Sequence, residues 1–133
     1  MKKTIQILTV GLLTLPLLLS SCDKGSPVCE ETKKTSAIVF DFPDSVSTSE
    51  TFDLEVKYVL DNSCGEFDSF EIVSDDNETQ VTLYATYEGC NCNLEFEERS
   101  QTYPIQIPQE GFYQYSFWVD EDVWESYSLK VYE

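Results

Sequence analysis

The stretch FDLEVKYVL, residues 52–60, shows most clearly which fold to expect. Every second residue in it is apolar, and charged residues stand between them at Asp53, Glu55 and Lys57. A period of two places the apolar side chains on one face of an extended strand and the charged ones on the other. The stretch therefore predicts a β-strand with one face buried in a core.

The same alternation returns along the rest of the chain, and sequences that favour turns separate the alternating stretches. Short strands that each have one apolar face must bury it against a second sheet or in a closed barrel. We therefore predict an all-β fold, an antiparallel β-sandwich of about eight strands over residues 37–133. The apolar positions expected to face its core are Ile38, Phe40, Phe42, Phe52, Leu54, Val56, Tyr58, Leu60, Phe70, Ile72, Val81, Leu83, Ala85, Tyr87, Cys92, Leu94, Phe96, Ile105, Ile107, Tyr113, Tyr115, Phe117, Val119, Tyr127, Leu129 and Val131.

The C-terminal stretch, residues 111–131, has a Gly-x-Tyr-x-Tyr strand followed by a last strand that ends in alternating aliphatic residues. This pattern is similar to the final hairpin of immunoglobulin-like domains in bacterial surface proteins of the Bacteroidetes type. The resemblance implies an immunoglobulin-like sandwich. A fold of this kind does not fix an activity.

Composition narrows the classes of function. The 133 residues include 8 Lys and Arg against 25 Asp and Glu, a net charge of −17, and no His. Without a basic patch, nucleic acid is not an expected partner. Without His, the commonest metal ligand and the usual general base near neutral pH are missing. Catalysis would rest on carboxylates alone, as in a small carbohydrate-active hydrolase, and no spacing singles out such a pair. We expect no enzyme and no cofactor.

The first 22 residues have the form of an export signal. A cationic start is followed by an apolar run over residues 5–19, which is shorter than the roughly 20 residues of a membrane-spanning helix. The run ends in Leu19-Ser20-Ser21-Cys22, which resembles the lipobox of bacterial lipoprotein precursors. The resemblance implies that residues 1–21 are a lipoprotein signal peptide and that Cys22 carries a diacylglycerol and an acyl chain such as palmitate. An ordinary signal peptide with an accidental cysteine is the alternative.

This resemblance implies a place in the cell as well. We expect a lipid-anchored protein of the cell envelope, at the outer membrane, facing either the periplasm or the outside. Residues 22–36 are rich in Gly, Ser, Pro and charge and show no periodicity, so we expect the lipidated cysteine to be followed by a flexible tether.

The cysteine count supports export. Five cysteines would leave one spare thiol in an oxidising compartment, and a lipid on Cys22 leaves four, which predicts two disulfides. We place Cys90 and Cys92 at a strand start, where their side chains would lie on one face about 6.5 Å apart, an awkward distance for a direct bond. We therefore expect Cys29 and Cys64 each to pair with one of them, in either combination. A four-thiolate metal site is the alternative, although no C-x-x-C pair is present.

Two features could serve binding. Asp75 and Asp76 belong to one acidic loop and Asp120 and Asp122 to another, and such oxygen-rich loops could hold calcium, although charged turns without an ion explain them equally. Trp118 and Trp124 flank the second loop, where an exposed indole could stack on a sugar or anchor a protein, unless both are buried.

These features together predict a lipid-anchored, non-catalytic binding or structural module with an unidentified protein or glycan partner. A carboxylate-dependent hydrolase and a calcium-dependent adhesion module are the alternatives.

Overall fold

The computed structural model describes residues 29–133, which form nine strands and no helix. The predicted signal peptide and the predicted lipidation site at Cys22 lie outside these residues. None of residues 29–133 belongs to a helix that is long and apolar enough to cross a membrane. The strands are β1 (Glu30–Thr35), β2 (Ala37–Ile38), β3 (Ser45–Ser47), β4 (Phe52–Leu60), β5 (Gly65–Asp75), β6 (Glu78–Glu88), β7 (Glu97–Ile105), β8 (Gly111–Asp120) and β9 (Val123–Tyr132).

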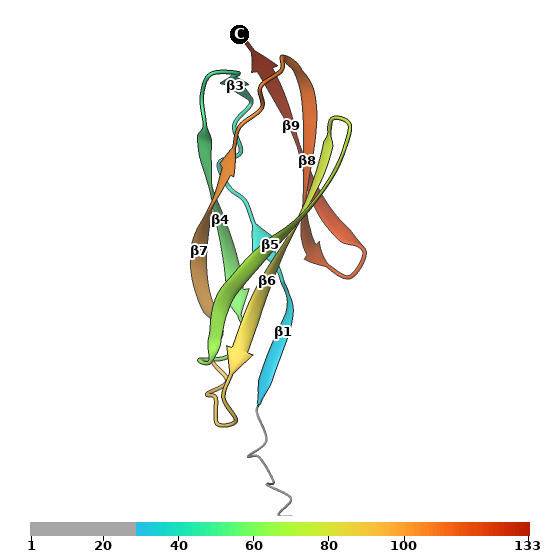
Figure 1. The fold of residues 1–133 in the computed structure, drawn as a ribbon. Helices are drawn as coiled ribbons and strands as arrows, with labels where there is room; N and C mark the ends of the chain where they lie inside the picture. Colours follow the sequence, from blue (N-terminus) through green and yellow to red (C-terminus); the bar gives the residue numbers. More distant parts are fainter. Residues whose placement is uncertain (1–28) are drawn as a thin grey trace, which may run out of the picture.

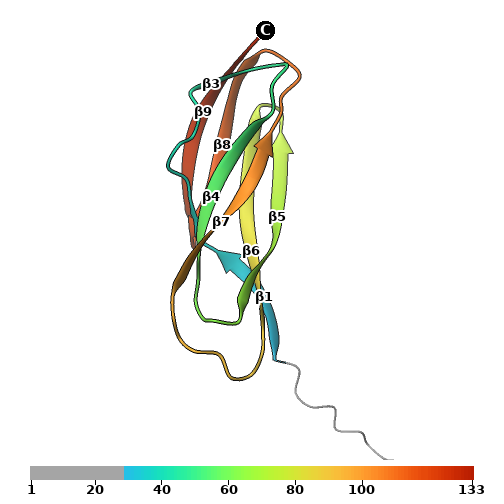
Figure 2. The ribbon, with the colours of Figure 1, turned by 90° about the vertical axis from the view of Figure 1, so that its left-hand side faces the viewer.

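The strands form two facing sheets, which confirms the predicted all-β sandwich and agrees with an immunoglobulin-like arrangement (Figure 1; Figure 2). The larger sheet has the order β1-β6-β8-β9-β3, with β5 paired to β6 as well, and the smaller sheet has the order β2-β4-β7. Five of the seven strand pairs are antiparallel, while β3 with β9 and β6 with β8 are parallel. Alternation of apolar residues is the same in either direction, so it could not distinguish these pairs.

The core lies between the sheets and is built from the alternating positions. Its largest fully buried side chains are Phe117, Leu54, Leu60, Leu83, Ile105, Leu129, Val56 and Val81, all on predicted core positions. Aromatic rings fill one part of it: Phe42 stacks on Tyr127 with ring centroids 4.9 Å apart, and Tyr103 meets Phe117 edge-on at 6.3 Å. The core thus joins residues of both sheets through contacts that are distant in sequence.

The predicted tether is wrong for Glu30–Thr35, which forms β1 along β6. Thr35 donates a hydrogen bond from its hydroxyl to the carbonyl oxygen of Val59 at 2.6 Å, so the end of β1 is also fixed to β4 in the other sheet. The next residues cross to that sheet as β2. The domain therefore begins before residue 37. The polar composition of β1 concealed it, because this strand contributes little to the core.

For residues 37–40, the prediction of which side chains face the core is wrong too. Ala37 and Val39 are buried, whereas Phe40 is 69% exposed. The register explains this result, because Ala37 pairs with Tyr58, whose side chain faces the core, and residues directly opposite each other share a face.

The stretch 92–96 is also no strand, and β7 begins only at Glu97. Here a disulfide at Cys92 and backbone contacts at Asn93 fix a loop instead. Leu94 and Phe96 therefore point away from the core, with exposed fractions of 90% and 82%.

Candidate binding site

The hairpin of β8 and β9 brings the two tryptophans together. Trp118 lies opposite Trp124 in the register of the two strands, so both side chains lie on one face of the hairpin. Phe117, the neighbour of Trp118, is fully buried, which places the tryptophans on the outer face of the larger sheet. Trp118 is half-buried and Trp124 is 36% exposed. The structure thus places neither tryptophan in the core between the sheets.

The turn of this hairpin presents carboxylates beside the tryptophans. Asp122 has a φ of 56°, a left-handed conformation that Asp tolerates better than most residues. The backbone N–H of Glu121 donates to the Asp120 side chain at 2.8 Å, which caps the turn. Glu121 and Asp122 are exposed.

A gap in the larger sheet makes a hollow next to this turn. Strands β1 and β8 both pair with β6, β1 with residues 83–88 and β8 with residues 78–81. Beyond Phe117, β8 no longer pairs with β6 and faces β1 instead. The resulting open hollow, about 680 Å³ in volume, is called here the tryptophan groove. Its lining residues are Lys33, Lys34, Trp118, Glu121, Asp122 and Trp124.

The two lysines of the tryptophan groove have different partners. Lys34 places its Nζ 5.6 Å from the ring centroid of Trp118, a cation–π contact. Lys33 forms an ion pair with Asp61 at 2.6 Å and lies over the ring of Tyr87. The hydrogen bond with Asp61 raises the pKa of Lys33. Lys34 is thus the lysine of the tryptophan groove whose ammonium lies over Trp118.

The acidic loops lie at two separate hairpin turns. Asp75 and Asp76 are at the turn between β5 and β6, where Asp76 has a φ of 51°, and Asp120 and Asp122 are at the turn between β8 and β9. Within residues 29–133 no three His, Cys, Asp or Glu side chains are grouped so that they could hold a metal ion. The backbone of the turns accounts for Asp76 and Asp122, since Asp adopts left-handed φ values more readily than most residues.

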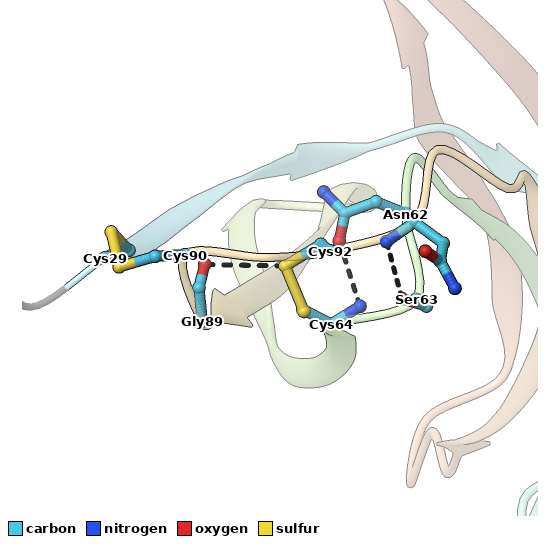
Figure 3. The surroundings of a disulfide bond; sticks show 8 residues. Cys29, Asn62, Ser63, Cys64, Gly89, Cys90 and Cys92 are labelled. Atoms are coloured by element: carbon cyan, nitrogen blue, oxygen red, sulfur yellow. Dashed lines mark hydrogen bonds between the residues drawn. A yellow bond between two sulfur atoms is a disulfide. The ribbon is translucent and has the colours of Figure 1, made fainter.

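Two disulfides fasten the end of the domain where β1 begins (Figure 3). Cys29 bonds to Cys90 and Cys64 bonds to Cys92, which selects one of the two pairings that the sequence left open. Cys90 and Cys92 lie in the loop after β6, not at a strand start. Gly89 has a φ of 133°, a backbone conformation that residues with a side chain rarely adopt, and a Cβ there would also lie 3.1 Å from the Cys64 sulfur, so a substitution would be strained.

Hydrogen bonds hold the same loop against the chain before β5. The backbone N–H of Ser63 donates to the Asn93 carbonyl at 3.0 Å, and the N–H of Asn93 donates to the Ser63 hydroxyl at 3.0 Å. Sequence reasoning missed both this fastened loop and the role of Lys34. The unusual apolar pair after Cys92 and the two adjacent lysines were the available signals.

Comparison with known proteins gives one family. The model of the ORF11 beta-sandwich domain matches residues 54–131. The matched stretch runs from β4 into β9, so it includes both tryptophans, while Lys34 lies outside it. Neither the curated proteins nor the solved structures contain a match.

Proposed function

Because the chain belongs to the family of the ORF11 beta-sandwich domain, whose description names a fold and no activity, we propose a function from its own residues: a non-catalytic binding module. The tryptophan groove is the proposed binding site. The observation that carries this proposal is the pairing of Trp118 with Trp124 on the outer face of the sheet, with Trp124 exposed beside charged side chains of both signs.

A glycan is the ligand class that fits this groove best. A sugar has apolar ring faces that can lie against an indole and hydroxyl groups that both donate and accept hydrogen bonds. Glu121 and Asp122 can accept from such hydroxyls, and Lys34 can donate to them. The net charge of −17 disfavours polyanionic chains, so the proposed ligand is a neutral or cationic glycan.

Anchoring at the cell envelope by a lipid on Cys22 is the second part of the proposal. The lipobox-like sequence before Cys22 supports it. The disulfides support it too, since they pair the four other cysteines of the chain with one another. Two or more acyl chains give stable membrane attachment where one gives only marginal binding.

The binding proposal is tested with the full chain, purified in detergent and applied to an array of neutral and cationic oligosaccharides. Trp124→Ala should abolish the signal of the bound glycans. Phe40→Ala, which removes an exposed aromatic ring outside the tryptophan groove, should leave it unchanged. Absence of any glycan signal for the natural chain, or equal loss in both variants, would refute a glycan site. Capture of an envelope protein through Trp124 would assign the groove to a protein partner instead.

The anchor is tested separately by fractionation. Cys22→Ser should move the protein from the membrane fraction to the soluble one, and mass spectrometry of the natural chain should show an acylated N-terminal Cys22. Membrane association that survives this substitution would exclude the lipid anchor.

A further inference from the structure

The loop between β6 and β7, residues 89–96, exposes two large apolar side chains. Leu94 and Phe96 are 90% and 82% exposed, more than any other large hydrophobic residue in the described part of the chain. Large exposed hydrophobic side chains grouped on one short segment often mark a contact surface. These two residues are called here the apolar tip.

The apolar tip stands on a fastened base. Cys90 and Cys92 are both in disulfides, and Asn93, the residue directly before Leu94, exchanges two hydrogen bonds with Ser63. The loop is therefore held from Cys90 to Asn93. Its exposed side chains project from this base, and loss of conformational freedom on binding is correspondingly small at its root.

The apolar tip lies at the end of the molecule where the N-terminal chain enters. Cys29 is bonded to Cys90 of the same loop, and the N–H of Gly89 donates to the Cys29 carbonyl at 2.8 Å. Both ribbon views show this loop beside the start of β1, with the C-terminus at the opposite end (Figure 1; Figure 2). Cys22 precedes Cys29 by seven residues, a length that spans at most about 25 Å.

We propose that the apolar tip inserts into the interface of the bilayer that anchors the chain, and so sets the orientation of the domain on the membrane. This inference rests on the proposed lipid at Cys22. An anchor within about 25 Å keeps the tip at high local concentration near the bilayer, so that a small apolar contact suffices. The transfer of apolar side chains from water to the acyl boundary of a bilayer is favourable.

The charges around the apolar tip indicate which lipid headgroups it can approach. Glu95 stands between the two apolar residues, and Glu30, Glu31 and Glu88 are exposed at the same end of the domain. Anionic headgroups would repel these carboxylates. The partner is therefore a bilayer surface rich in zwitterionic lipid.

The test uses the full chain as it is purified in detergent after expression with its N-terminal leader, reconstituted in phosphatidylcholine vesicles whose acyl chains are brominated to quench tryptophan. In Phe96→Trp the added emission should be blue-shifted and quenched. The matched control is Phe112→Trp, a 72% exposed position that pairs with Lys130 near the C-terminal end, and its added emission should not be quenched. The natural chain gives the background from Trp118 and Trp124.

The outcomes separate this inference from the anchor. A chain that floats with the vesicles while position 96 is unquenched retains the anchor and refutes the membrane contact. A chain that fails to float, with unmodified Cys22, refutes both. Analytical ultracentrifugation of the detergent-solubilised natural chain and of Leu94→Ser should give the same molecular mass. A dimer that this substitution abolishes would assign the apolar tip to a second copy and refute the lipid contact.

Discussion

Phe117 lies in the core between the two sheets. It is fully buried on β8 and contacts Tyr103 of the opposite sheet edge-on, with a centroid distance of 6.3 Å and an interplanar angle of 90°. It also contacts Tyr127 of the neighbouring strand at 6.0 Å. Such edge-on pairs contribute beyond the free energy of burial alone. A single residue therefore connects three strands of the core.

Phe117→Ala should lower the free energy of unfolding by about 3–5 kcal/mol, because it removes a buried ring and leaves a cavity. Urea unfolding followed by fluorescence measures the change. Phe112→Ala on the same strand is the control, and it should cost less than about 0.5 kcal/mol because Phe112 is 72% exposed. Similar losses in the two variants would mean that position 117 is not buried as described.

Tyr103 links stability to pH at the alkaline end. Burial raises the pKa of Tyr103 from 10.0 to about 12. Between these values the unfolded chain loses a proton that the folded chain keeps, so the free energy of unfolding falls as pH rises. The contribution of Tyr103 to the free energy of unfolding is complete below pH 10 and is lost as the pH approaches 12. It amounts to about 2–3 kcal/mol at most.

Urea unfolding at several pH values from 9 to 12 measures this dependence. Tyr103→Phe should show a shallower fall in stability than the natural chain. The surface variant Phe112→Ala should keep the natural pH profile, since it removes a 72% exposed ring that carries no titratable group. Equal slopes in the natural chain and Tyr103→Phe would contradict the assignment.

Strand β1 has few apolar residues and is held in the larger sheet by other contacts. Its six residues pair with β6, its last residue bonds to β4, and Cys29 before it is tied to Cys90 after β6. A strand with mostly exposed side chains gains little from burial. The disulfide compensates by limiting the separation of the two strands in the unfolded chain.

Removing the disulfides should therefore have graded effects. The Cys29–Cys90 bond spans 61 residues and the Cys64–Cys92 bond spans 28. On the chain-entropy model, Cys29→Ser with Cys90→Ser should cost about 4 kcal/mol, and Cys64→Ser with Cys92→Ser about 3.5 kcal/mol. Thermal and urea unfolding measure both. Hydrogen exchange should show loss of protection in β1 for the first pair of substitutions only, and unchanged protection there would contradict the role of this bond.

Most of the negative charges of the molecule are not paired with a positive side chain. The net charge is −17, and the described residues form three ion pairs, Lys33 with Asp61, Lys57 with Glu98 and Arg99 with Glu97. Exposed pairs of this type contribute at most about 1 kcal/mol each. Repulsion among carboxylates across the surface should therefore dominate the electrostatics of the compact state.

Added salt should consequently stabilise the fold. The screening length falls from about 30 Å at 0.01 M to about 10 Å at 0.1 M salt, which weakens long-range repulsion. The melting temperature should rise between sodium chloride concentrations in this range, as measured by circular dichroism. Sucrose at matched osmolality serves to separate screening from a general solute effect. A melting temperature that falls with salt would show that the ion pairs outweigh the repulsion.

Local patterns in the sequence predicted much of the molecule. Alternation alone identified β4, β6, β8 and β9, and the cysteine count implied two disulfides. Both tryptophans were singled out because they flank an acidic turn. These features depend on residues that are near one another in the chain, where side-chain period and turn chemistry act directly.

Contacts between distant residues decided the rest. Four features depend on which strands become neighbours. They are the pairing of the cysteines, the parallel direction of β6 and β8, the burial of Ala37 rather than Ile38, and the contact of Lys34 with Trp118. A period of two gives each strand an apolar face without naming its partner or its direction. Only the packing of two sheets around one core selects the partners, because each choice of neighbour buries a different set of faces.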